Sequence, residues 1–127
     1  MEIKFYEYIE ATPEEIFLAL TNPFTIELWS DSPAKMDANE GTEFELWDGD
    51  ICGRNLKVVT NQELVQEWYF DEQPEPSIAT IKLHPHKTGT QVEVKHTNVP
   101  DEAFKNINDG WHDAYIGAIK RFFEEDL

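Results

Sequence analysis

Residues 101–127, DEAFKNINDGWHDAYIGAIKRFFEEDL, decide the fold of this 127-residue chain. Apolar side chains recur in this stretch at intervals of three and four residues, which places them on one side of an α-helix. They are Phe104, Ile107, Trp111, Ala114, Tyr115, Ala118, Ile119, Phe122 and Phe123. The spacing predicts a helix of about six turns that begins at Asp101 as its cap. No second helix of similar length is expected, so the broad apolar face must pack against a sheet from the middle of the chain.

The first 30 residues predict a strand followed by two short helices. Residues 2–10 alternate between apolar and other side chains and are rich in aromatic and branched residues, as in a strand. Thr12 and Glu15 form a capping box around Pro13, which fits the first position of a helix. Asn22 is the expected cap of the second helix.

From residue 31 onward the pattern is one of strands and turns. The predicted strands are residues 34–38, 42–48, 52–60, 63–71, 78–84 and 90–97, with turn residues between them. Consecutive strands joined by short turns form an antiparallel sheet, because parallel neighbours need long crossovers. We therefore expect an α+β fold over residues 1–127 as a single domain, with a sheet of six to seven strands under the long helix.

Composition and charge restrict the partners. Ten basic residues against 26 acidic ones give a formal net charge of −16, which repels nucleic acid and anionic membranes. The acidic surface either keeps the protein soluble or meets a partner with a basic face. The amino terminus has no signal-peptide pattern, no apolar run is long enough to span a bilayer, and Cys52 is the single cysteine. A cytoplasmic protein is expected.

Motifs along nearly the whole chain resemble a known family. They are TPEEIF (12–17), ALTNP (19–23), SPA (32–34), GTEF (41–44), DGDICG (48–53), EWYF (67–70), ATIKL (79–83), GTQVEV (89–94), VP (99–100), GW (110–111) and AIKRF (118–122). In this order they resemble the carboxy-terminal domain of the activator of the heat-shock protein 90 ATPase, within the START-like superfamily. The resemblance implies the helix-grip fold, in which a long terminal helix lies across a curved antiparallel sheet.

Two functions are compatible with this resemblance. The eukaryotic activator stimulates the ATPase of a chaperone of the heat-shock protein 90 type, although it does much of its binding through a separate amino-terminal domain. The wider superfamily binds small apolar ligands beneath the long helix. The fold alone does not decide between a co-chaperone and a ligand carrier.

Large aromatic and polar side chains can converge where helix and sheet meet. The ligand-pocket candidates are Trp29, Phe44, Arg54, Trp68, His96, Trp111 and Tyr115. Rigid rings that cannot pack flush leave a gap, and indole N–H, phenol, imidazole or guanidinium groups can orient a ligand there. The alternative is that the same rings simply fill the core. Gly110, beside Trp111, is expected to allow a close approach between the helix and a neighbouring element.

No pattern predicts catalysis, a cofactor or a metal. His84 and His86 have strand spacing for two metal ligands, but they flank Pro85 next to a turn, and no third ligand follows. His112 and Asp113 are adjacent on the predicted helix and point in different directions. Cys52 is expected to be an inert, buried thiol. The expected function is therefore non-enzymatic.

Overall fold

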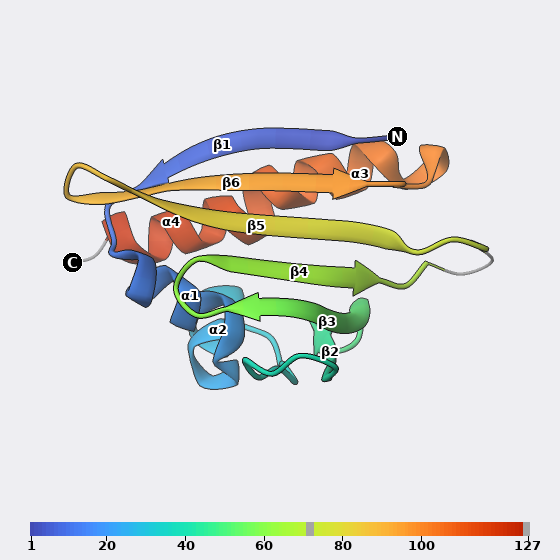
Figure 1. Cartoon of the computed structure of the whole chain (residues 1–127), viewed down its shortest axis with the longest axis horizontal. Coiled ribbons are helices and arrows are strands. Elements are labelled where there is room, and N and C mark those ends of the chain that lie inside the picture. Colours follow the sequence, from blue (N-terminus) through green and yellow to red (C-terminus); the bar gives the residue numbers. More distant parts are fainter. Residues whose placement is uncertain (71–72, 126–127) are drawn as a thin grey trace.

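The computed structural model describes residues 1–70 and 73–125, which form one antiparallel sheet with helices on a single face (Figure 1). Six strands follow the order β1-β6-β5-β4-β3-β2 across the sheet, so each pair of neighbours except β1 and β6 is consecutive in the chain. Their bounds are β1 (Ile3–Ile9), β2 (Glu43–Leu46), β3 (Ile51–Val59), β4 (Glu63–Trp68), β5 (Ser77–His86) and β6 (Gly89–Thr97). All pairs are antiparallel, as short turns require.

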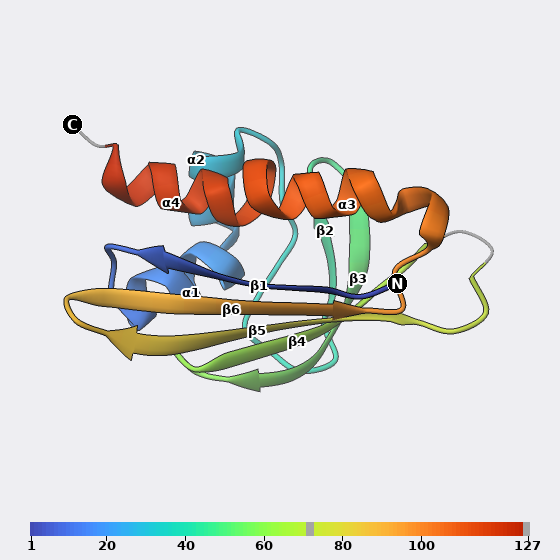
Figure 2. The same ribbon diagram turned by 90° about the horizontal axis from the view of Figure 1, so that it is seen from above.

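The helices share the inner face of the curved sheet, as the view in Figure 2 shows. Two short helices, α1 (Pro13–Thr21) and α2 (Pro23–Ser30), cover one end of that face. The carboxy-terminal helix runs along it and has four parts. These are a 3₁₀ turn (η1, Asp101–Ala103), α3 (Phe104–Gly110), a π-helical turn (η2, Trp111–Tyr115) and α4 (Ile116–Glu124). This architecture confirms the predicted helix-grip fold.

The caps of the two short helices are those that the sequence predicts. The Thr12 hydroxyl accepts a hydrogen bond from the Glu15 amide at 3.1 Å, and the Glu15 carboxylate accepts one from the Thr12 amide at 2.9 Å. Asn22 Oδ1 accepts from the Thr25 amide at 3.1 Å. These bonds satisfy amides that the first helical turn leaves without intrahelical partners, so each helix has a defined start.

One predicted strand is wrong. In residues 34–38 a single residue, Lys35, pairs with Glu45, through backbone hydrogen bonds of 2.8 and 2.9 Å. The Asp37 carboxylate then accepts from the Asn39 amide at 2.9 Å, a local turn that competes with continued pairing. The described residues therefore contain six strands, the lower of the two expected numbers.

Several predicted boundaries also move. The strand expected over residues 42–48 ends at Leu46, and the one over residues 63–71 ends at Trp68, with Asp71 outside the described residues. Strands β5 and β6 extend to a hairpin with Lys87 and Thr88 at its tip, shorter than the predicted loop. Lys87 has a φ of 56°, the left-handed conformation common in such tight turns.

The start of the terminal helix differs from the prediction as well. Asp101 opens the 3₁₀ turn and makes no side-chain capping bond, and the α-helix begins three residues later at Phe104. The Asp101 carboxylate lies instead 3.9 Å from the amino group of Met1. None of the helices in the described ranges is long and apolar enough to cross a membrane.

Candidate functional site

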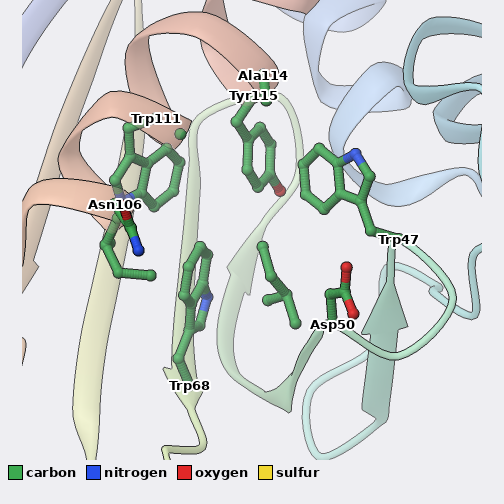
Figure 3. Close-up of a pocket in the computed structure, with 10 residues that line it drawn as sticks. Trp47, Asp50, Trp68, Asn106, Trp111, Ala114 and Tyr115 are labelled. Carbon is green, nitrogen blue, oxygen red and sulfur yellow. The ribbon is translucent and has the colours of Figure 1, made fainter. Parts of the chain in front are cut away.

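A pocket of about 240 Å³ lies between the carboxy-terminal helix and the β3–β4 end of the sheet (Figure 3). Its wall is mostly aromatic and aliphatic, with Asp50 and Asn106 as charged and amide side chains. The lining residues are Trp47, Asp50, Ile51, Trp68, Asn106, Ile107, Gly110, Trp111, Ala114 and Tyr115. The helix and the sheet thus both contribute to one concave, mainly apolar site, the usual form of a small-molecule pocket.

Stacked rings form the deep wall of the pocket. The ring of Trp111 lies 4.7 Å from that of Tyr115 and 5.0 Å from that of Trp68, with interplanar angles of 21° and 20°. Trp47 meets Tyr115 edge-on, at 5.5 Å and 68°. Such offset and edge-to-face contacts are the favoured arrangements of aromatic pairs, so the wall is rigid.

Five of the seven pocket candidates gather at this wall. Trp68, Trp111 and Tyr115 line the pocket directly. Trp29 lies behind Tyr115 at a ring distance of 5.3 Å, and His96 lies behind Trp68 at 4.7 Å. Both supporting residues are buried and hold the lining rings in place.

The structure places the other two candidates elsewhere. On β3 the side chains alternate, so Arg54 points to the outer face of the sheet and pairs with Glu67 at 3.4 Å. Phe44 is buried in the core against Gly53, where an added Cβ would lie 2.8 Å from the phenyl ring and would overlap the Glu67 carbonyl. Gly53 is thus needed for a close approach, whereas Arg54 has no access to the pocket.

Trp47 and Asp50 are not among the predicted pocket residues, because a turn directs them to the pocket. The predicted strand over residues 42–48 would put Trp47 on the outer face, but β2 ends one residue earlier. Trp47 and Asp48 have φ of 50° and 54°, and Gly49 has a φ of 95°, so the chain turns back sharply and brings the indole to the pocket. The Asp48-Gly49 pair is the signal that could have shown this, since it marks a turn beside a large aromatic residue.

His96 is a neutral anchor for the helix. Its Nδ1 accepts from Trp111 Nε1 at 3.0 Å, and an indole nitrogen can only donate. Nε2 therefore carries the proton and donates to the Ser77 hydroxyl at 2.6 Å, and that hydroxyl donates to the Thr97 carbonyl at 3.1 Å. Burial lowers the pKa of His96 to about 4, so the ring remains uncharged at neutral pH.

A second buried chain of hydrogen bonds fixes Trp68. Its Nε1 donates to Gln66 Oε1 at 3.0 Å, and Gln66 Nε2 donates to Asn55 Oδ1 at 3.1 Å. The amide of Asn55 donates in turn to the Asp37 carbonyl at 3.0 Å. Gln66 and Asn55 are fully buried, and satisfied networks of this kind hold a single side-chain arrangement.

Tyr115 differs from these anchored rings. Its side chain is buried, yet its hydroxyl has no hydrogen-bond partner in the described part of the chain. Burial raises the pKa of the phenol well above its usual value, so it is a neutral donor and acceptor. An unpaired buried hydroxyl lowers stability by about 1–3 kcal/mol, so a hydrogen-bond partner for the Tyr115 hydroxyl would be favourable.

The π-helical turn positions Trp111 and Tyr115 together on the pocket. The Ile116 amide bonds to the Trp111 carbonyl, five residues back, so the turn holds one residue more than an α-helical turn would. A Cβ at Gly117 would overlap the His112 carbonyl, and the Arg121 guanidinium donates to the Asp113 carbonyl at 2.7 Å. Gly117 and Arg121 therefore accommodate the wide turn, a feature that is frequent at functional sites.

Gly110 has a different role from the predicted one. A Cβ there would meet no atom within 4 Å, so the glycine does not permit a close helix contact. It lies instead in the wall of the pocket, where the missing side chain leaves space open.

The other reactive side chains do not extend the site. Cys52 is half-buried rather than fully buried as predicted. It donates to the Gly49 carbonyl at 3.1 Å, and partial burial, with Glu45 and Asp50 nearby, raises the pKa of its thiol. His84 binds Glu93 at 2.8 Å on the exposed part of the hairpin. Within residues 1–70 and 73–125, no group of three or more His, Cys, Asp or Glu side chains could hold a metal ion.

A curved antiparallel sheet that grips a long helix over an aromatic pocket defines the helix-grip class. Within this class, the chain belongs to the family described as "Activator of Hsp90 ATPase homolog 1-like protein", whose profile matches residues 10–124. Two curated relatives are "Activator of 90 kDa heat shock protein ATPase homolog 2" of Mus musculus and the corresponding homolog 1 of Homo sapiens. They are 29% identical over 122 residues and 27% identical over 124 residues.

The match covers most of this chain but only part of each relative. It spans 93% of this chain and 36% of the mouse protein, and 96% of this chain and 37% of the human protein. The chain therefore corresponds to about a third of the length of these relatives.

Solved structures share the fold. An HSP90 activator from Plasmodium falciparum has a TM-score of 0.88 at 23% identity, over 96% of this chain and 95% of that chain. The Aha1 dimer from Colwellia psychrerythraea has a TM-score of 0.86 at 18% identity, over 98% and 96% of the two chains. These likenesses confirm the architecture.

Proposed function

We propose that this protein acts on a chaperone of the heat-shock protein 90 type as an ATPase-activating, co-chaperone-like domain. The observation that carries the proposal is the family match over residues 10–124, together with curated relatives that are named as activators of this ATPase. The relatives are about three times longer, so the activity proposed for this chain is the part that one such domain can supply.

Exposed apolar side chains on the short helices support a contact with another protein. Phe24 and Leu28 are 79% and 71% exposed and lie one turn apart on α2, and Leu18 on α1 is 53% exposed. Apolar side chains that project together from a monomer commonly mark an interaction surface. The charge of −16 further favours a partner with a basic contact face.

The proposal is tested by adding the protein to the purified chaperone of the same organism and measuring ATP turnover and complex formation. We expect ATP turnover to rise in proportion to the amount of complex formed. The double variant F24S/L28S should form less complex and give a smaller rise in turnover. The matched control is Tyr6→Ser, since Tyr6 is 52% exposed on the opposite face of the sheet. Unchanged turnover and no complex with the unsubstituted protein would contradict the proposal.

The proposed function is non-catalytic. The raised pKa of the Cys52 thiol and its bond to the Gly49 carbonyl make it a poor nucleophile. His96 uses both ring nitrogens to anchor neighbouring side chains, which leaves neither for a substrate.

A second candidate function is the binding of a small apolar molecule beneath the helix. The specific observation in its favour is the pocket of about 240 Å³ whose buried Tyr115 hydroxyl has no described partner. We expect a rise in melting temperature with at least one member of a panel of lipids and aromatic metabolites. The absence of any rise across the panel would count against it, whatever the outcome of the chaperone assay.

A further inference from the structure

The wall of the pocket offers a ligand one buried polar atom. The indole nitrogens of Trp29, Trp68 and Trp111 already donate, to the Ala19 carbonyl, Gln66 Oε1 and His96 Nδ1 at 2.8–3.0 Å. Trp68 and Trp111 therefore present carbon to the pocket, and Trp29 presents carbon to Tyr115 from behind. Among the described lining residues, the Tyr115 hydroxyl is the buried polar atom without a partner, and Figure 3 shows it at the end of its ring farthest from the helix.

A water molecule is a poor partner for this hydroxyl. A buried water usually needs two to four polar neighbours, and the indoles of Trp29 and Trp111 beside Tyr115 offer it none, because their nitrogens already donate elsewhere. Trp29, Trp47 and Trp111 all lie within 4.7–5.5 Å of the tyrosine ring, measured between ring centroids. An oxygen atom attached to an apolar body would instead satisfy the hydroxyl and cover the rings at the same time.

The charges around the pocket exclude an anionic ligand. Asp50 lines the pocket, and none of the described lining residues is basic. The net charge of −16 adds a repulsive field. A carboxylate in this site would lose its hydration without gaining a counter-ion, which is strongly unfavourable.

The shape of the wall favours a flat molecule. Trp68, Trp111 and Tyr115 are nearly parallel, with interplanar angles of 15–21°, so a flat molecule matches the orientation of the rings in the wall. The volume of about 240 Å³ lies below the range of roughly 300–1,000 Å³ for drug-sized ligands, which limits the occupant to one or two rings.

We propose that the pocket binds an uncharged, flat aromatic molecule of one or two rings, whose hydroxyl or carbonyl oxygen hydrogen-bonds to the hydroxyl of Tyr115. This inference rests on the second candidate function above and names the class of its ligand. It excludes fatty acids and other carboxylates, and it makes Tyr115 the residue that selects oxygen-bearing ligands over pure hydrocarbons.

The test is a titration calorimetry experiment with three probes of one shape: 2-naphthol, 2-methylnaphthalene and 2-naphthoate. We expect Tyr115→Phe to weaken the binding of 2-naphthol by about 3- to 10-fold, which is the effect of losing one hydrogen bond. The affinity for 2-methylnaphthalene should stay the same or rise. The wild-type protein should bind 2-naphthoate more weakly than 2-naphthol. The melting temperature of Tyr115→Phe, measured in parallel, shows that the variant is folded.

Two further variants locate the binding. Tyr6→Phe removes a hydroxyl from an exposed tyrosine on the outer face and should change none of the affinities. Gly110→Leu adds a side chain in the pocket wall, where a Cβ meets no atom within 4 Å, and should block every probe while the protein stays folded.

Different results would contradict the proposed ligand class and the binding of apolar molecules in the pocket. Suppose that both neutral probes bind and that Gly110→Leu blocks them. If Tyr115→Phe then changes the affinities for 2-naphthol and 2-methylnaphthalene equally, or changes neither, the proposed ligand class is wrong, although the pocket still binds apolar molecules. Binding of 2-naphthoate at least as tightly as 2-naphthol also overturns the class. If no probe binds the wild-type protein up to its solubility limit, both the class and the second candidate function fall.

Discussion

The two halves of the carboxy-terminal helix pack in different ways. No residue of α3 is buried, whereas Ile116, Gly117 and Ile119 of α4 are buried in the core. The π-helical turn between them carries Trp111 and Tyr115, both almost fully buried. One half of the helix therefore closes the core, and the other half covers a pocket.

Two glycines show what separates the halves. Gly110, at the end of α3, faces open space, and Gly117, at the start of α4, has no room for a Cβ because of the His112 carbonyl. The extra residue of the π turn changes which side of the helix faces the sheet. A single irregular turn thus lets one helix serve both as core and as pocket wall.

Acid should loosen the anchor between the pocket half and the sheet. Folded His96 resists protonation down to a pKa of about 4, whereas the unfolded chain takes up the proton near pH 6.5. The contribution of His96 to stability is then constant above about pH 6.5 and falls by about 3 kcal/mol as the pH drops from 6.5 to 4. Denaturant unfolding at several pH values measures this, and the difference from His96→Gln removes the carboxylate contributions. Equal slopes for both proteins would contradict it.

Gly117→Ala should disturb the π turn directly. The new Cβ overlaps the His112 carbonyl, so the backbone must shift, and we expect a loss of about 1–3 kcal/mol in the free energy of unfolding. Chemical denaturation gives the value. A variant as stable as the wild type would show that the turn adapts without cost.

Tyr115→Phe should stabilise the protein, whereas most substitutions in a core destabilise it. It removes the unpartnered hydroxyl and keeps the ring contacts, so we expect a gain of about 1 kcal/mol in the absence of ligand. Thermal and denaturant unfolding both report it. A loss of stability would mean that the hydroxyl has a partner in solution.

Gly110→Ala should give the smallest change in the free energy of unfolding, and the change should be an increase. The methyl group enters open space in a helix, and replacing glycine there by alanine stabilises by about 0.5–1 kcal/mol. Set beside Gly117→Ala, this matched substitution measures the difference between the two halves of the helix. Equal changes in stability at both positions would show that the two halves of the helix do not differ in this way.

Much of the fold followed from local patterns. The capping box of Thr12 and Glu15 and the cap of Asn22 form as predicted, because these bonds involve residues three apart in the chain. The antiparallel sheet followed from short turns between strands. The predicted strand at residues 34–38 failed because a local turn at Asp37 ended pairing, which strand propensity does not show.

The pocket was predicted only in part. Helical spacing identified Trp111 and Tyr115, and residue type within a predicted strand identified Trp68, since large rings must be buried somewhere. Arg54 was misplaced because its side depends on the register of β3, and Trp47 was missed because left-handed residues turn it inward. Neither register nor turn conformation is fixed by composition.

The sequence by itself determined the layers of this protein: an aromatic stripe at helical spacing demands a sheet, and alternating strands with short turns provide one. Only the tertiary structure decided that the stripe does not pack flush. The π turn, Gly117 and the bond from Arg121 to the Asp113 carbonyl set the rotation of Trp111 and Tyr115. That rotation depends on backbone hydrogen bonds between turns of the helix, which no pattern of side chains specifies, and it leaves the Tyr115 hydroxyl in an apolar pocket.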